Sequence, residues 1–173
     1  MSGEYSRVLT ETLREFPDFS IVRKTDSRFM CLLGWLLFFN RGFMTGFHTT
    51  IGSTLYVTPG WEQMADLDRA ALLRHERVHL RQQRRYGMAL YAFLYTLLLP
   101  AVFTFRARLE QEAYEESLRA QLEYWGPGSF TPELREWYLR CFTGSAYFWM
   151  RPFRKSVASW YDGVLRGMLP KPD

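Results

Sequence analysis

The chain has 173 residues, of which 47% are hydrophobic and 23% are charged. This balance excludes a disordered chain, and the length predicts a single folded domain over residues 1–173. The net charge of +4 permits attraction to anionic surfaces, but it does not indicate a nucleic-acid-binding protein by itself. Aromatic residues make up 17%, so we expect some of them to line a groove or to contact lipid.

Two isolated cysteines, Cys31 and Cys141, lack the Cys-x-x-Cys spacing of a thiolate zinc site and are expected to be buried thiols. The first residues lack the basic segment and apolar run of an export signal. We therefore expect a cytoplasmic protein.

The first third of the chain predicts one short helix followed by strands. Charged and apolar residues recur with a helical period over residues 6–16, and the run 19–24 has the β-branched and aromatic residues of a strand. Residues 29–39 are almost all apolar but too few to span a bilayer, so they are predicted to lie in the core as a buried strand or helix. The stretch 43–57 predicts one or two further strands.

A helix over residues 66–86 carries the most informative motif. His75 and His79 are four residues apart with Glu76 directly after the first, so both imidazoles lie on one face of the helix, one turn apart. This spacing allows both histidines to bind one Zn²⁺ ion while Glu76 meets its bound water. An accidental match to the motif is the alternative interpretation.

The same helix is predicted to begin at Asp66, a good N-cap residue, and to end before Gly87. Its predicted inner face comprises Ala71, Leu72, His75, Val78, His79 and Gln82. Its outer face carries a row of arginines at positions Arg74, Arg77, Arg81, Arg84 and Arg85. We interpret this row as a solvated face and disfavour nucleic-acid binding, because no base-stacking aromatic residues accompany it.

Residues 88–105 form an uncharged run of eighteen residues. This length is the threshold for a membrane-spanning helix. A span would place any metal ligand beyond residue 105 roughly 27 Å from the histidines. We therefore expect Gly87 to reverse the chain, residues 88–99 to return beside the motif helix, and Pro100 to start another turn. Peripheral membrane contact through residues 88–105 is the alternative.

The last third is predicted to be helical. Residues 106–124 have a strongly helical composition, and residues 125–129 are the clearest loop in the chain. The next helix begins with Thr131 as its N-cap and runs to residue 142, and a final helix covers residues 152–167. With the N-terminal strands, this pattern predicts an α+β fold.

Two histidines alone hold zinc poorly, and a hydrolytic site usually has three protein ligands and a water. Glu110 shares a helix face with Ala113, whose small side chain allows close packing, whereas Glu112 lies on a face that looks solvated. A buried carboxylate needs a charged partner such as a metal. Glu110 is therefore the predicted third ligand, with Glu112 and His48 as alternatives.

With these residues, the chain resembles the gluzincin group of zinc metallopeptidases, in which a second helix with a Glu-x-x-Ala-Asp type motif follows the His-Glu-x-x-His helix. The matching stretch here is residues 110–114, Glu-Gln-Glu-Ala-Tyr, and the resemblance covers roughly the middle third of the chain. It implies one Zn²⁺ ion as cofactor and Glu76 as general base. The implied metal ligands are His75, His79 and Glu110. Tyr114 replaces the family's acidic residue, so the ligand histidines must be oriented differently.

The resemblance implies a mostly helical zincin-like domain with a small N-terminal β-sheet packed on the motif helix. The predicted function is a zinc-dependent metallopeptidase that hydrolyses a peptide or protein substrate. The strand within residues 48–57 is predicted to border the cleft and to pair with an extended peptide, or else to be an edge strand covered by a loop.

An oxyanion-stabilising residue is also needed. The candidates are Tyr56, Tyr114, Tyr147 and His48. Two other functions compete with peptidase activity: a catalytically weak zinc-binding interaction module, and a membrane-associated protein with a peripheral metal site.

Overall fold

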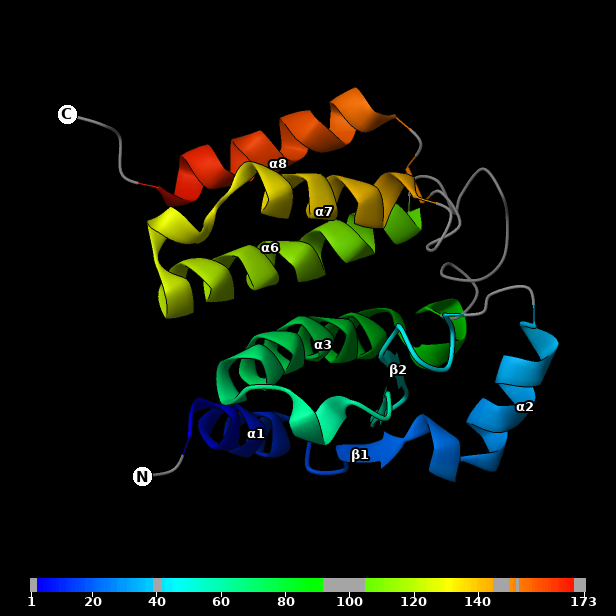
Figure 1. The fold of residues 1–173 in the computed structure, drawn as a ribbon. Helices are drawn as coiled ribbons and strands as arrows, with labels where there is room; N and C mark the ends of the chain where they lie inside the picture. The colour runs from blue at the N-terminus through cyan, green and yellow to red at the C-terminus, as the bar shows by residue number, and fades with distance from the viewer. Residues whose placement is uncertain (1–2, 39–41, 92–104, 145–149, 152, 170–173) are drawn as a thin grey trace. The chain divides into compact units, whose positions relative to one another are not determined.

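The computed structural model describes residues 3–38, 42–91, 105–144, 150–151 and 153–169 (Figure 1). The chain divides into two compact units, Met1–Arg85 and Tyr86–Asp173. The described elements are mostly helices with one three-stranded sheet, which confirms the α+β class. That both units act as one domain stays a prediction.

The first unit contains the sheet and the motif helix. In chain order its elements are α1 (Glu4–Glu15), β1 (Ser20–Arg23), a 3-10 turn (Lys24–Asp26), α2 (Arg28–Leu36), β2 (Thr49–Ile51), β3 (Thr54–Val57), a second 3-10 turn (Trp61–Gln63) and α3 (Asp66–Tyr86). The predicted first helix, first strand, pair of strands within 43–57 and motif helix are all confirmed.

The sheet has the strand order β1-β3-β2, with β1 parallel and β2 antiparallel to β3. β2 and β3 form a hairpin whose two-residue connection contains Gly52 at φ 60°, the left-handed conformation that such tight turns require. Leu55 and Val57 of the central strand are buried. Because β3 lies between β1 and β2, β2 is an edge strand of this sheet.

The arginine row of α3 contacts α1 rather than facing only solvent. Arg77 donates to Glu11 at 3.1 Å, and Arg81 donates to Glu15 at 2.6 Å. At the start of both helices, the backbone N–H of Tyr5 donates to the Asp66 carboxylate at 3.2 Å. Contacts that advance together along both helices show that α1 and α3 run parallel. Arg81, Arg84 and Arg85 are exposed, as the interpretation of a solvated face predicts. The interpretation is wrong for Arg77, whose side chain is only 13% exposed.

The buried face of α3 is also rotated from the predicted one. Its buried residues are Ala70, Leu73, Glu76, His79, Leu80, Gln82 and Gln83. Four residues that we predicted on the inner face are only half-buried, namely Ala71, Leu72, His75 and Val78. The reason is that α3 meets α1 on one side and β2 on another, so that its covered face is wider than the apolar stripe.

The prediction that residues 29–39 lie in the core was wrong over its described part. Ser27 caps a helix there, because its side chain accepts a hydrogen bond from the backbone N–H of Met30. Met30 is buried, but most of the other large side chains of α2 are exposed. Residues 39–41 lie outside the described part of the chain.

The described residues of the second unit form three long helices: α6 (Ala107–Trp125), α7 (Pro132–Thr143) and α8 (Arg154–Met168). Gly126 ends α6 with φ 75°, and the Thr131 hydroxyl caps α7 by accepting from the Leu134 N–H at 3.2 Å. All three predicted helices are confirmed, although α8 begins two residues later than predicted.

Aromatic residues form much of the core of this second unit. Tyr114 packs against Tyr138 and Phe142 with ring centroids 5.5 and 5.2 Å apart, and Tyr138 packs on Tyr161. The Cys141 thiol is buried among them as predicted, and burial raises its pKa to about 11. Cys31 is exposed, so the prediction of two buried thiols was wrong for this residue.

The apolar stretch after α3 is described only at its two ends. Gly87 has φ 75°, and the backbone N–H of Tyr91 donates to the Gly87 carbonyl at 2.9 Å in a further helical turn. The return and the turn at Pro100 that we predicted fall in residues 92–104, outside the described residues. None of the helices within the described ranges is long and apolar enough to cross a membrane.

Candidate metal centre

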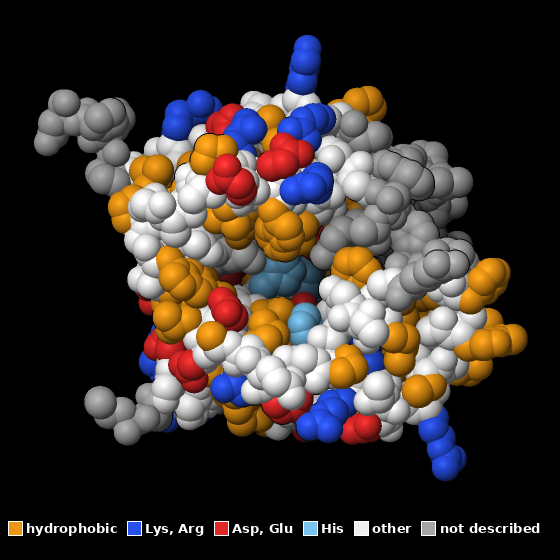
Figure 2. Space-filling view, in the orientation of Figure 1, with side chains coloured by type: hydrophobic (Ala, Val, Ile, Leu, Met, Phe, Trp, Pro, Cys, Tyr) orange, Lys and Arg blue, Asp and Glu red, His pale blue; other side chains and the backbone are white. Residues whose placement is uncertain are grey.

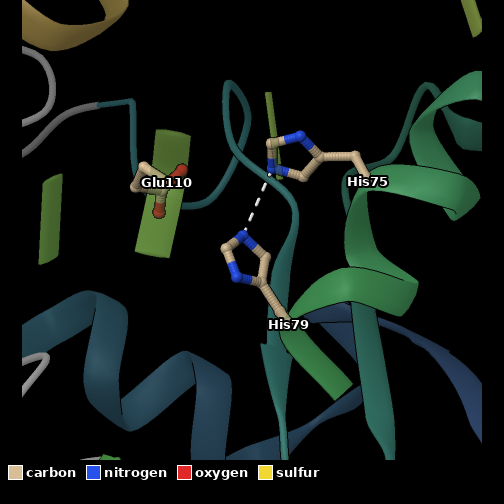
Figure 3. A group of neighbouring side chains, drawn as sticks. All are labelled: His75, His79 and Glu110. Carbon is tan, nitrogen blue, oxygen red and sulfur yellow. Dashed lines mark hydrogen bonds between the residues drawn. The ribbon is translucent and has the colours of Figure 1, made fainter. Parts of the chain in front are cut away.

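Two imidazoles of α3 face each other one helical turn apart. The Nε2 atoms of His75 and His79 are 3.2 Å apart, and the ring centroids are 5.0 Å apart in an edge-to-face arrangement (Figure 3). The i, i+4 spacing places the side chains on one face of the helix, as the sequence predicted.

The carboxylate of Glu110 joins this pair. The ligand atoms of His75, His79 and Glu110 all lie within 4.8 Å of one another (Figure 3). Glu110 lies in the first turn of α6 and is 4% exposed, and Ala113 one turn later is fully buried. The alternative ligand Glu112 is exposed, and neither it nor His48 belongs to the group.

These three side chains fit the donor set of a zinc site. Zinc binds histidine nitrogen at about 2.0–2.1 Å in tetrahedral geometry, so two nitrogens on one ion are about 3.3 Å apart. The observed Nε2 separation of 3.2 Å is close to that value. Two imidazoles and one carboxylate also leave the fourth position open, as in catalytic rather than structural zinc sites.

Gln82 orients one of the two imidazoles. Its amide oxygen Oε1 lies 2.9 Å from Nδ1 of His79, and Gln82 is 1% exposed. An amide oxygen only accepts hydrogen bonds, so the proton of the neutral ring lies on Nδ1 and the Nε2 lone pair is left for a metal. This contact therefore orients the His79 ring.

The carboxylate of Glu76 is held by the edge strand. The Thr50 hydroxyl of β2 donates to Glu76 Oε2 at 2.6 Å, and Glu76 is 7% exposed. The Gln83 amide of α3 donates to the Thr50 carbonyl at 3.4 Å. Both side chains of α3 thus contact the same residue of β2, which fixes the edge strand against the motif helix.

A buried cation lies near Glu76. Lys24 has no exposed surface, and its ammonium donates to the Phe43 carbonyl at 2.7 Å and lies 4.0 Å from the centroid of the Phe43 ring. Burial lowers the pKa of Lys24 to about 8, and attraction to Glu76 opposes this shift.

His48 occupies a different environment from the other two histidines. Its Nδ1 accepts a hydrogen bond from the Thr58 N–H at 3.4 Å, and its ring packs edge-on against Trp61. Burial lowers the pKa of His48, whereas Glu76 raises it and Lys24 lowers it further. The ring is therefore neutral at pH 7, with its proton on Nε2.

The other candidates for oxyanion stabilisation differ in their surroundings. The ring of Tyr114 is buried in the aromatic core of the second unit, and Tyr56 is half-buried on β3. Tyr147 lies outside the described residues.

Three residues around the motif were not assigned these roles from the sequence. Gln82 was predicted on the inner face but given no role, although its place three residues after His79 on a helix was a usable signal. Thr50 and Lys24 come from distant parts of the chain, and only the fold brings them near Glu76.

Replacement of Gln82 with methionine should weaken zinc binding. The substitution keeps the side-chain length but removes the acceptor that orients His79, so we expect the zinc affinity to fall about 10–100-fold. Competition against a chelator of known zinc affinity measures this change. The neighbouring variant Gln83→Met serves as the control, because Gln83 contacts Thr50 and no proposed ligand. Equal affinities in both variants would contradict an orienting role.

Lys24 should make folding stability depend on alkaline pH. Its pKa is about 8 in the fold, and the ordinary pKa of lysine is 10.5, so between these values the unfolded chain binds a proton that the folded chain has released. Stability from this residue is therefore lowest below about pH 8 and rises towards pH 10.5.

Urea denaturation of the wild type and of Lys24→Met across this range measures the effect. The free energy of unfolding of the wild type should rise relative to that of the variant as the pH increases. Parallel curves would show that the Lys24 pKa is not lowered by burial.

No protein-family model, no curated protein and no solved structure matches this chain. The centre is accordingly interpreted from its own geometry. That geometry is a group of two histidines and one glutamate at metal-binding distances in an α+β protein.

Proposed function

We propose that the chain is a zinc-dependent metallopeptidase with a zincin-like fold, in which His75, His79 and Glu110 hold one Zn²⁺ ion. The observation that carries this proposal is that the Nε2 atoms of His75 and His79 lie 3.2 Å apart. Glu76, which follows His75 in the sequence, has a buried carboxylate that does not belong to the ligand group. A site that only binds zinc does not require the additional carboxylate of Glu76.

Zinc, when bound, lowers the pKa of a coordinated water towards about 7 and polarises a substrate carbonyl. Glu76 is the general base that takes the proton of the attacking water and passes it to the leaving amine. The Thr50 hydroxyl fixes one carboxylate oxygen of Glu76, which leaves the other oxygen to accept the proton.

Among the oxyanion candidates, His48 has the best support. Its neutral ring carries a proton on Nε2, because Nδ1 accepts from the Thr58 backbone. The electrostatic effect of Glu76 on the pKa of His48 indicates that the His48 ring lies near this carboxylate. A neutral N–H donor aimed at a developing negative charge is the usual chemistry of an oxyanion site.

The edge strand β2 is the proposed docking element for substrate. An extended peptide can add to a sheet edge through backbone hydrogen bonds, and here the edge strand also carries the hydroxyl that holds Glu76. Gln83 already donates to the Thr50 carbonyl, so a bound peptide would depend on the other backbone groups of β2.

The zinc ligand set can be tested with two glutamates of one helix. Glu110→Ala should reduce bound zinc well below one equivalent, because it removes a buried ligand. Glu112→Ala is the matched control, since this residue is exposed two positions away and should leave zinc content unchanged. Elemental analysis of the purified proteins measures both. Zinc-free wild type, or equal zinc in both variants, would contradict the ligand assignment.

The catalytic assignment is tested by Glu76→Gln. This variant should keep its zinc but lose roughly 10²–10⁴-fold in peptide hydrolysis, the usual contribution of a general base. A quenched fluorescent peptide library reports cleavage, and His79→Ala should lose zinc and activity together. A wild type that binds zinc and cleaves no peptide in the library would support a zinc-binding interaction module instead.

A further inference from the structure

One helix of the first unit exposes an almost wholly apolar surface. Its large side chains are 52–79% exposed, and Figure 2 shows hydrophobic side chains gathered over α2 at the right of the view. We call this set the α2 outer face: Phe29, Leu32, Trp35 and Leu36 of the helix, and Phe38 just beyond it. A patch of this kind on a folded protein usually marks a binding surface.

The opposite side fixes the helix to the unit. Met30 is fully buried, and Gly34 lies so close to a neighbouring side chain that a Cβ there would be 2.7 Å from Met44 Sδ. Hence the helix is anchored by one narrow face, and its larger side chains are presented outward. This arrangement is the reverse of an ordinary surface helix, whose apolar stripe faces the core.

The charges near the patch favour an anionic partner. From Arg23 to Trp61 the sequence contains four basic residues, of which Lys24 is buried, and one acidic residue, Asp26, and the whole chain has a net charge of +4. Arg28 lies in the first turn of α2 and is exposed. Apolar and aromatic side chains beside basic ones are typical of helices that lie in the interface of an anionic bilayer.

The size of the patch argues against a second copy of the chain. At the observed exposures, five such side chains offer roughly 600 Å² of surface. A stable protein interface of standard size needs about 800 Å² from each partner and shape complementarity. A lipid interface needs neither, because acyl chains and headgroups adapt to the inserted side chains.

We propose that the α2 outer face inserts into the surface of a membrane that contains anionic lipids. Trp35, Phe29 and Phe38 enter the headgroup and acyl boundary, and Arg28 meets the lipid phosphates and carboxylates. The helix lies in the membrane plane and does not cross it. The proposed contact uses only α2 and Phe38 and does not depend on the metal centre.

Co-sedimentation of the full chain with vesicles tests the proposal. The wild type should bind vesicles of equal parts phosphatidylcholine and phosphatidylserine, and bind vesicles of phosphatidylcholine alone more weakly. In the double variant Leu32→Ser with Trp35→Ser, the partition coefficient should fall at least about tenfold. Both positions are exposed, so the thermal unfolding midpoint should change little. The single variant Phe38→Ser, beyond the helix, should show a smaller loss and serves if the double variant does not fold.

A matched control removes two other exposed apolar side chains, Met88 and Leu90, by substitution with serine. This control should bind vesicles as the wild type does. Absence of vesicle binding by the wild type would overturn the proposal, as would loss of binding in the control but not in the α2 variant. A wild-type dimer that the α2 variant converts to monomer, without vesicle binding, would assign the face to a second copy instead.

Discussion

The arrangement of the centre depends on one constraint: two imidazole nitrogens of adjacent turns of α3 must face each other at 3.2 Å. Two nitrogen lone pairs at this distance repel unless a proton or a cation lies between them. Because Gln82 holds the ring proton of His79 on Nδ1, the Nε2 atom of His79 can only accept a hydrogen bond or bind a cation. The pair therefore accommodates either a proton shared from His75 or a metal ion, and the nearby carboxylate of Glu110 favours a cation.

The surroundings of this pair place opposite charges in a buried environment. Glu76 is nearly inaccessible, and the fully buried Lys24 interacts with it electrostatically. Burial of either charge alone would be costly, but attraction between them and hydrogen bonds to Thr50 and to the Phe43 carbonyl offset part of that cost. The hydroxyl that holds this carboxylate is thus on a residue outside the proposed ligand group.

Sequence patterns predicted the elements that depend on local signals. The capping hydroxyl of Thr131 and the left-handed Gly87 mark helix ends, as the sequence predicted. The choice between Glu110 and Glu112 also follows from helical periodicity, because of these two glutamates only Glu110 is buried and belongs to the ligand group.

Features that depend on tertiary contacts could not be predicted in the same way. Residues 29–39 look like core by composition, because hydrophobicity does not tell whether an apolar surface is covered by the chain or left exposed. Lys24 looks like a surface lysine, and nothing nearby in sequence predicts its burial. Thr50 and Glu76 are brought together only by the packing of β2 on α3. The rotated face of α3 likewise reflects the presence of α1.

The parallel pairing of α1 with α3 also changes what the basic character of the chain means. Arg77 and Arg81 already form ion pairs with Glu11 and Glu15 of the same chain. A phosphate-rich polymer would have to displace these tethered carboxylates, whose local concentration is set by the fold and not by the solution. The sequence pI of about 9.2 therefore overstates the positive potential that α3 offers to outside molecules. The carboxylates of α1 thus partly neutralise the positive charge of α3, the helix that carries His75 and His79.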